Sequence, residues 1–418
     1  MLNKKKEREL AYVVRVDDIK PIPGRDRVEC AVVGGWTLMV RKDQFAPGSL
    51  GIYFEVDSKC PMEEPFMFLE SKHFKIKTQK YKTPEGQFWS QGLLMGAEDF
   101  GWGLYEDKAI VDKEGFFHNV DDESRFLTQK LGITYADPED VARKSNNGVD
   151  KYKKMAQRHP DLFQKKFIRW LYKRTWGKKI LFIFFGKKKD KTPTSFPTHF
   201  PYVKKTDQER CENMIWVLED KTPFIKTQKC DGSSGTFILE RKKFNKYEFY
   251  VCSRNVRQLN ENQKCFYDDN HYWDVAIKYD IENKLKDYMD KHSELTYVCW
   301  QGEVCGPAIQ KNPHGLTENH LFLFHFIDSK QGKWDIREAE KVWKSYDMEV
   351  VPIVDRNFIL PDDFEEFKEQ SEGFYEPSVC EGKTKQPREG FVYYKTTDPN
   401  FSFKNVSRSY LLKHQGGE

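Results

Sequence analysis

The chain has 418 residues, more than one hydrophobic core usually supports and enough for two or three domains. Hydrophobic residues make up 38% and charged residues 32%, which excludes a largely disordered or membrane-embedded chain. The longest apolar run, Ile180–Phe185, is far shorter than the about 20 residues that span a bilayer, so we expect no membrane partner. Net charge is only +4, but Lys and Arg concentrate between residues 142 and 191. The charge distribution therefore draws attention to the middle of the chain.

The nine cysteines are odd in number, and no two of them form a CxxC pair. That pattern fits neither a disulfide framework nor a zinc site. It indicates a protein from a reducing compartment. The first residues, Met1–Glu9, contain no apolar segment of the kind found in secretory signals. We expect a cytoplasmic protein and a monomer.

The first region, residues 1–125, contains short apolar stretches separated by turn residues such as Pro23-Gly24, Gly34-Gly35 and Pro47-Gly48. That spacing favours a small antiparallel barrel or sandwich. A five-stranded OB barrel is one candidate, and OB barrels often bind nucleic acid.

The second region, residues 126–195, is basic and is expected to be a helical linker or insertion, with helices at Asp137–Asn147 and Lys151–Gln164. Its stretch Lys165–Lys179 interleaves aromatic and basic residues. Two interpretations stay open. The stretch is either a solvated amphipathic helix, or a contact in which bases neutralise RNA phosphates and aromatics stack on nucleobases.

The third region, residues 196–418, is expected to be α+β with antiparallel sheets, because its runs of strands have intervening helices but are mainly hairpin-like rather than alternating with helices. The expected helices are Asp207–Asp220, Tyr272–His292 and Ile336–Tyr346. The expected strands are Gly235–Glu240, Tyr247–Cys252, Leu295–Gln301, Leu321–Ile327 and Gly390–Tyr394.

One hexapeptide in this region, Lys229-Cys230-Asp231-Gly232-Ser233-Ser234, suggests covalent chemistry. A lysine attacks only when it is neutral, so its site must hold its pKa down or remove the proton during attack, and nearby cations or a metal can do that. On an extended segment Asp231 shares a face with Lys229, and Gly232 permits a tight turn. The bare pattern also occurs by chance in surface turns.

Further short motifs follow the hexapeptide in a fixed order: Ser253-Arg254-Asn255, Gln301-Gly302-Glu303, Leu323-Phe324-His325-Phe326, Glu389-Gly390-Phe391 and Phe403-Lys404. The series resembles the covalent nucleotidyltransferases, which are polynucleotide ligases and mRNA capping enzymes. This resemblance covers residues 196–418, and the ordered set is far more specific than any single motif.

The details look most like RNA ligases, in particular Gly306-Pro307-Ala308-Ile309-Gln310-Lys311 after Glu303. The N-terminal stretches Pro21–Glu29 and Tyr53–Ser58 are similar to the OB module of one branch of that family. That branch seals nicks between a 3′-OH and a 5′-phosphate. The basic middle region has no counterpart in the resemblance.

The resemblance implies the catalytic roles. Lys229 would attack the α-phosphorus of ATP and expel pyrophosphate, with Asp231 beside it. Lys404 would contact the α-phosphate and offset the charge that builds there. Phosphoryl transfer depends mainly on such positioning and charge neutralisation.

The resemblance also implies a nucleotide site. Gln228 stands where the family usually has a Glu that meets the adenine amino group. Glu303 would bind the ribose, Arg254 would contact the sugar or an RNA phosphate, and Phe326 would stack on adenine, with Phe324 as its rival.

Metal and RNA contacts are implied as well. Glu389, with Asp231, would hold Mg²⁺ or Mn²⁺, because hard cations prefer oxygen ligands. Lys311 is a candidate for contact with RNA, as are Lys75 and Lys77 of the N-terminal module.

The last motif departs from the family, which usually places two lysines one residue apart; here Ser402 fills the first place. Lys404 must then carry most of that charge, or Lys395 or Lys413 assists.

The sequence thus predicts an ATP-dependent RNA ligase that passes through lysyl-AMP and an adenylylated RNA 5′ end. Two alternatives share the lysine chemistry: a capping guanylyltransferase and a DNA ligase. Both usually carry the OB domain after the lysine domain, so the domain order here disfavours them. A third alternative is an inactive nucleic-acid-binding protein, which only the departures at Gln228 and Ser402 support.

Overall fold

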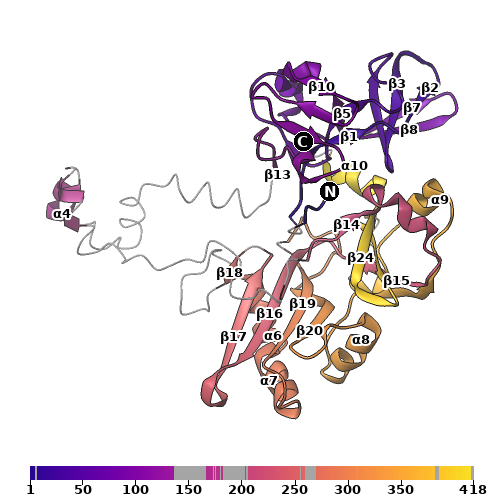
Figure 1. Cartoon of the computed structure of the whole chain (residues 1–418). Helices are drawn as coiled ribbons and strands as arrows, with labels where there is room; N and C mark the ends of the chain where they lie inside the picture. Colours follow the sequence, from indigo (N-terminus) through magenta and orange to yellow (C-terminus); the bar gives the residue numbers. More distant parts are fainter. Residues whose placement is uncertain are drawn as a thin grey trace.

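The chain folds as an α+β protein in which a β-barrel lies on one side of a larger two-sheet domain (Figure 1). This computed structural model describes residues 1–4, 7–135, 166–172, 174, 176–178, 180–181, 203, 206–254, 256–258, 270–307, 309–381 and 386–415. The helices expected at Asp137–Asn147 and Lys151–Gln164 lie outside these residues. Among the helices that are described, none has the length and apolar character needed to cross a membrane.

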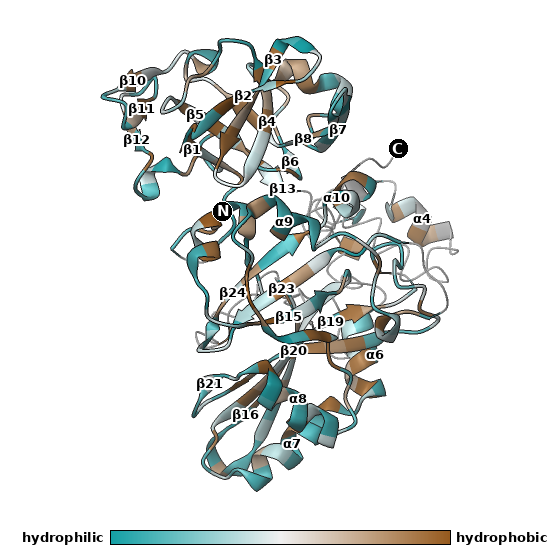
Figure 2. Cartoon of the chain, turned by 90° about the vertical axis from the view of Figure 1, so that its right-hand side faces the viewer, coloured by the Kyte–Doolittle hydropathy of each residue, from teal (hydrophilic) through white to brown (hydrophobic). Residues whose placement is uncertain are grey.

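The N-terminal barrel is built from short antiparallel strands, as its turn-rich sequence predicts. In β4 (Trp36–Arg41), buried and partly exposed side chains alternate, so one face of the strand packs inward. The other strands are β1 (Ala11–Arg15), β2 (Asp18–Ile22), β3 (Arg25–Val33), β5 (Leu50–Phe54), β6 (Ser58–Lys59), β7 (Thr78–Thr83), β8 (Gly86–Gln91), β9 (Leu93–Met95), β10 (Gly103–Tyr105), β11 (Ala109–Val111), β12 (Phe117–Asn119) and β13 (Thr134–Tyr135). Hydrophobic residues gather inside the barrel and inside the C-terminal sheets (Figure 2).

The larger domain contains two sheets. The six-stranded sheet is antiparallel throughout and runs β18 (Arg257–Gln258), β17 (Tyr247–Ser253), β16 (Ser233–Arg241), β19 (Tyr297–Cys305), β20 (His320–Asp328) and β21 (Gly332–Lys333). The five-stranded sheet runs β14 (Glu209–Arg210), β24 (Asp398–Val406), β23 (Gly390–Lys395), β15 (Phe224–Lys229) and β22 (Ile353–Phe358). Only the β14–β24 pair in it is parallel.

Helices cover the six-stranded sheet and close its core. α6 (His271–Lys278) and α7 (Ile281–Lys291) contact β16, β17 and β19, and α8 (Ile336–Ser345) contacts β20. The sequence predicts one helix over Tyr272–His292; two form, because Asp280 takes a left-handed conformation with φ 49°. The remaining described α-helices are α4 (Lys166–Tyr172), α9 (Phe364–Glu369) and α10 (Arg408–Gln415).

The helix expected at Asp207–Asp220 is wrong. This segment instead forms β14 and the two 3₁₀ turns η4 (Cys211–Asn213) and η5 (Ile215–Glu219). The reason is tertiary: β14 pairs with β24, and the Glu212 carbonyl accepts the Gly35 N–H from the barrel at 2.7 Å. Those backbone groups are therefore unavailable to a helix.

The same segment joins the two domains. Trp36 Nε1 of the barrel donates to Asn213 Oδ1 at 2.7 Å. Lys368 and Glu212 form a fully buried ion pair of 2.7 Å behind it. A Cβ on Gly35 would come within 2.7 Å of Glu212 Cα, so only glycine allows this close approach. The barrel is thus held where its first strands face the start of the larger domain.

Candidate active site

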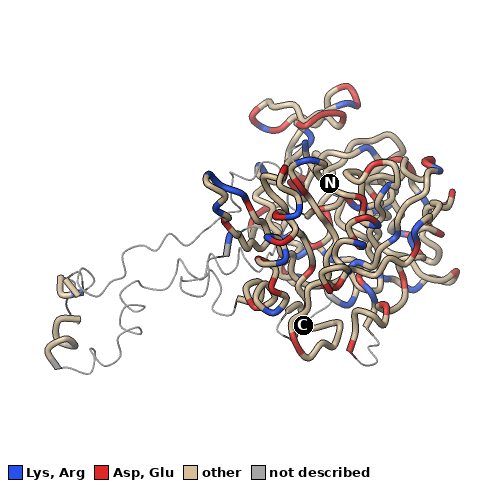
Figure 3. Tube along the Cα trace, turned by 90° about the horizontal axis from the view of Figure 1, so that it is seen from below, with Lys and Arg blue, Asp and Glu red and all other residues tan. Residues whose placement is uncertain are grey.

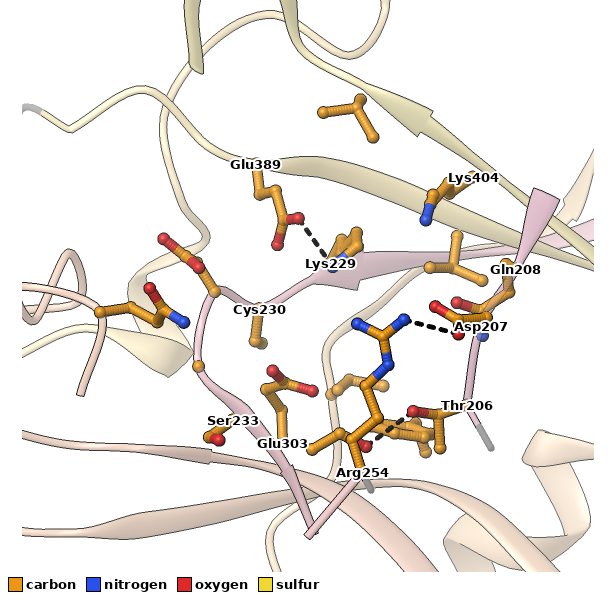
Figure 4. A pocket seen from close by; sticks show the side chains of 18 of the residues that line it. Thr206, Asp207, Gln208, Lys229, Cys230, Ser233, Arg254, Glu303, Glu389 and Lys404 are labelled. Carbon is orange, nitrogen blue, oxygen red and sulfur yellow. Dashed lines mark hydrogen bonds and ion pairs between the residues drawn. The ribbon is translucent and has the colours of Figure 1, made fainter. Parts of the chain in front are cut away.

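Lys229 is the last residue of β15, at the point where the chain passes from the five-stranded to the six-stranded sheet. Its pairing partner is Gly390 on β23, which places Glu389 beside it. A Cβ on Gly390 would come within 2.0 Å of the Asn405 carbonyl oxygen, and its φ of 136° also requires glycine. Lys229 Nζ lies 2.8 Å from Glu389 Oε1 (Figure 4).

The strand register also brings Lys404 to this face. Lys404 on β24 pairs with Val392 on β23, and Val392 pairs with Thr227 on β15. Thr227 and Lys229 are two residues apart, so both point to the same side of the sheet. The side chain of Lys404 accordingly faces the same cavity as that of Lys229 (Figure 4).

The turn after Lys229 carries Asp231 and leads into β16. The Asp231 N–H donates to Nε2 of the buried His314 at 3.2 Å, which fixes the turn. A Cβ on Gly232 would come within 2.4 Å of the Val304 carbonyl oxygen, so glycine lets β16 pair closely with β19. Glu303 on β19 lies opposite Ser234 and reaches the cavity from the six-stranded sheet.

These side chains line a cavity of about 480 Å³. Most of the residues selected from the sequence meet there: Gln228, Lys229, Asp231, Arg254, Glu303, Lys311, Glu389 and Lys404. Lys75 and Lys77 do not line it, and neither does Phe326. Their roles, and those of the residues in the cavity, stay predictions.

Phe326 is misplaced in the sequence interpretation. Its side chain is fully buried in the core, with ring centroids 4.8 Å from Trp334 and 5.2 Å from Tyr288. The partly exposed Phe324 lines the cavity instead. The pairing of β19 with β20 has a bulge next to Gly302, and a bulge changes which side chains share a face.

Gln228 and Arg254 are held by specific partners. The Gln228 amide donates to the Gly390 carbonyl at 2.9 Å, and its oxygen accepts the Glu376 N–H at 3.4 Å. Arg254 Nη2 lies 2.7 Å from Asp207 Oδ2, which orients the guanidinium at the cavity wall.

The lysine itself is not yet a nucleophile. Burial alone would lower the pKa of Lys229, but the neighbouring carboxylates of Glu389 and Glu303 outweigh it and raise the pKa above its usual value. The sequence argument expects the opposite direction. The pKa is raised because three carboxylates surround the lysine. A cation bound among these carboxylates would lower the pKa of the lysine.

The carboxylates are crowded. Burial, followed by the charges of Glu389 and Asp231, raises the pKa of Glu303 to about 8. Burial and Glu389 also raise the pKa of Asp231. Within the described residues, the buried Glu389 Oε2 has no hydrogen-bond partner. Buried, mutually repelling oxygens with a spare acceptor suit a hard divalent cation.

The opposite wall of the cavity is cationic. Burial, then Arg8 and Arg210, lowers the pKa of Lys404 to about 7. Arg210 is 5% exposed; its Nη2 lies 3.5 Å from Asp57 Oδ2, while its Nε and Nη1 have no hydrogen-bond partner in the described part of the chain. Donors left in this way favour an anionic ligand with several oxygens.

Three further cavity residues lie before residue 136 and are not among the site residues selected from the sequence: Arg8, Asp57 and Tyr135. Arg8 binds Glu55 through Nε and Nη2 at 3.1 and 3.0 Å and lies over the Tyr135 ring. The suggested helpers of Lys404 lie elsewhere, since Lys395 pairs with Asp220 at 2.5 Å. Lys413 contacts Gln386. Arg8 and Arg210 supply the additional positive charge instead.

Comparison with known proteins agrees with this site. Residues 222–408, which contain the lysine, both sheets and the cavity carboxylates, match the family model described as RNA ligase. The larger domain thus matches the RNA ligase family over residues 222–408. Residues 10–96 match a model described as an OB-fold domain, so the barrel of the ligase is an OB module, as its sequence predicts. No curated protein matches the ligase.

Solved structures similar to the ligase include those of a Naegleria gruberi RNA ligase. Its complex with PPi is 25% identical, with a TM-score of 0.68, and the match covers 98% of this chain and 100% of that one. A lysine-to-alanine variant with ATP and Mn is 24% identical, with the same TM-score, and the match covers 98% and 99%. A lysine-to-methionine variant with AMP and Mn is 24% identical, again with a TM-score of 0.68, covering 98% and 100%.

Proposed function

We propose that this ligase uses ATP and a divalent cation to join RNA 3′-OH and 5′-phosphate ends through a covalent Lys229–AMP intermediate. The observation that carries the proposal is the position of Lys229 Nζ, 2.8 Å from Glu389, in a cavity with a carboxylate wall and a cationic wall. The similar Naegleria gruberi structures contain ATP or AMP together with Mn, which supports the choice of nucleotide and metal.

In the first step, the Lys229 amine attacks the α-phosphorus of ATP, a nitrogen–phosphorus bond forms, and pyrophosphate leaves. Lys404, Arg210 and Arg8 face the phosphates and offset the charge on their oxygens, which is the main task in phosphoryl transfer. Phe324 offers its ring to the adenine. Glu303 lies on the opposite sheet, within reach of the ribose.

Glu389, with Asp231, would hold the cation. When bound, a divalent ion supplies positive charge that lowers the pKa of a nearby amine and neutralises phosphate oxygens. The chain's own part is to release the lysine: Glu389 is the group that pairs with Nζ, so engaging its oxygens elsewhere frees the amine to lose its proton.

The later steps use the same site. The AMP passes to the RNA 5′-phosphate and regenerates the Lys229 amine; the RNA 3′-OH then attacks the activated end, seals the strand and expels AMP. Arg254 and Lys311, which line the cavity, would meet RNA phosphates. The OB module, with Lys75 and Lys77, would add affinity and register for the duplex beside the nick.

The eight cysteines of the described residues are free thiols, which supports a reducing, intracellular location for this reaction.

A labelling experiment tests the first step. The protein is incubated with α-labelled ATP or GTP and Mg²⁺ or Mn²⁺, then run on a denaturing gel. Label from ATP should remain on the protein and disappear in Lys229→Ala. The matched control Lys243→Ala, at an exposed lysine in a turn of the six-stranded sheet, should label normally. Label from GTP alone would favour a capping guanylyltransferase, and no label with either metal would reject the enzymatic proposal.

The choice of nucleic acid needs its own test. Nicked duplexes that differ only at the 3′-terminal sugar are compared at equal concentration. A ribose end should be sealed much faster than a deoxyribose end. Equal rates would identify a DNA ligase instead.

A further inference from the structure

The middle region contains an exposed apolar surface that the ligase reaction does not use. Four large side chains in and after α4 are strongly exposed: Phe167 at 67%, Trp170 at 47%, Trp176 at 52% and Ile180 at 40%. Behind them, the buried side chains of Leu171 and Leu181 pack into a small cluster. We call the four exposed side chains the α4 surface. Single exposed apolar residues are common, but a group of four within one short segment marks a site of interaction.

Charge distinguishes the same segment. Residues 162–189 contain ten Lys and Arg and no Asp or Glu. The whole chain has 69 basic and 65 acidic residues, so without this segment acidic residues are in excess. Over the rest of the described chain, both signs are intermixed (Figure 3). An anionic partner would therefore be attracted here more than to the remaining surface.

We propose that the α4 surface docks the ligase onto anionic lipid membranes. Trp and Phe settle at the boundary between headgroups and acyl chains. Arg174 and Lys178, which lie over the rings of Trp170 and Tyr172, would hold anionic headgroups while their stems lie along apolar surface. A membrane partner is not expected from hydropathy alone, because hydropathy detects spanning segments rather than surface-bound ones.

A nucleic acid is the competing occupant, and the ring contacts argue against it. The Phe167 ring is stacked on Trp170 with centroids 5.9 Å apart, and Arg174 Cζ lies 3.5 Å from the Trp170 centroid. Trp176 meets the same ring edge-on. These contacts occupy part of the ring surface on which a base would stack, and the exposed aliphatic side chain of Ile180 offers a base no ring.

The test measures co-sedimentation of the full chain with vesicles. Vesicles of phosphatidylcholine and phosphatidylserine in a two-to-one ratio are compared with vesicles of phosphatidylcholine alone. The protein should bind the anionic vesicles, and binding should weaken as salt is raised. In Phe167→Ser/Trp170→Ser/Trp176→Ser, binding to anionic vesicles should fall at least about tenfold. The matched control is Phe244→Ser, at a hairpin tip where the side chain is 94% exposed.

A parallel measurement follows the affinity for a nicked RNA duplex, which the triple variant should retain within about twofold. Three outcomes would overturn the proposal: no binding of the unaltered protein to anionic vesicles, equal binding by the triple variant, or a loss of RNA affinity as large as the loss of vesicle binding. The last would assign the α4 surface to nucleic acid. All substituted side chains are exposed, and unchanged thermal unfolding checks that the variants fold.

Discussion

The two walls of the active-site cavity differ in charge and in origin. The carboxylate wall, Asp231, Glu303 and Glu389, belongs entirely to the larger domain and surrounds Lys229. The cationic wall combines Lys404 and Arg210 of that domain with Arg8, which comes from the other end of the chain. Within each wall, burial and like charges disfavour the charged forms of the side chains. The pKa values of Glu303 and Asp231 are raised, and that of Lys404 is lowered.

The two walls suit ligands of opposite charge. A divalent cation would relieve the carboxylate wall and release Lys229 from Glu389, while the phosphates of ATP would relieve the cationic wall. Metal and nucleotide therefore stabilise opposite sides of one cavity. The following predictions separate the two walls.

The largest effect is expected at the carboxylate wall. Glu389→Gln keeps the size of the side chain but removes the charge that would hold the cation, so the rate of Lys229 labelling by ATP should fall about a hundredfold or more. The rate is measured by gel at several Mn²⁺ concentrations, and excess metal should restore part of it. Glu381→Gln, at a partly exposed carboxylate outside the cavity, serves as the control. An unchanged rate in Glu389→Gln would remove the carboxylate from the mechanism.

A smaller loss is expected at the cationic wall. Arg210→Gln removes the donors that would face the phosphates of ATP, so kcat/KM for ATP in the labelling reaction should drop about 10- to 100-fold. Arg210→Lys retains the charge without the fork of donors. Its kcat/KM should lie between those of the unaltered protein and Arg210→Gln. Because Arg210 also faces Asp57 of the barrel, thermal unfolding is measured alongside. Arg41→Gln, at an exposed arginine of β4, is the control. Equal kcat/KM for the unaltered protein and both Arg210 variants would show that Arg210 only joins the domains.

The carboxylate wall could be predicted from the sequence, but of the cationic wall only Lys404 could. Lys229, Glu303 and Glu389 stand in short motifs in or next to strands, and strand pairing then brings them together. Arg8 lies in a charged terminal stretch without any motif, and only the docking of the barrel carries it to the cavity. Arg210 stands in a segment that the sequence predicts to be a helix, whereas in the structure its backbone pairs with β24.

The sequence alone did not identify which of two aromatic residues lines the cavity. The strand Leu321–Ile327 is predicted correctly and forms part of β20, but alternation alone cannot tell Phe324 from Phe326 once a bulge interrupts the pairing. The two residues now make opposite predictions. Phe324→Ala should raise KM for ATP about tenfold with little change in stability, because it removes only a cavity wall. Phe326→Ala should cost about 3–5 kcal/mol of unfolding free energy and leave KM unchanged in the fraction that stays folded. Denaturant unfolding and ATP titration on both variants check this, and a KM effect confined to Phe326→Ala would restore the original assignment.

The smallest expected effect is a pH dependence of nucleotide binding at Lys404. With its pKa lowered to about 7 by burial and by the two arginines, Lys404 is mostly charged at pH 6 and mostly neutral at pH 8. Bound phosphates favour the charged amine, so the affinity for ATP should fall as pH rises between these values, by up to about tenfold. Binding is measured in the presence of a chelator, so that no reaction follows, and each value is divided by that of Lys404→Met to cancel the protonation of ATP itself. The ratio should approach one at high pH, because the neutral lysine then resembles methionine. A ratio that stays constant from pH 6 to pH 8 would mean that Lys404 does not face the phosphates, and the positive charge at that wall would have to come from Arg8 and Arg210 alone.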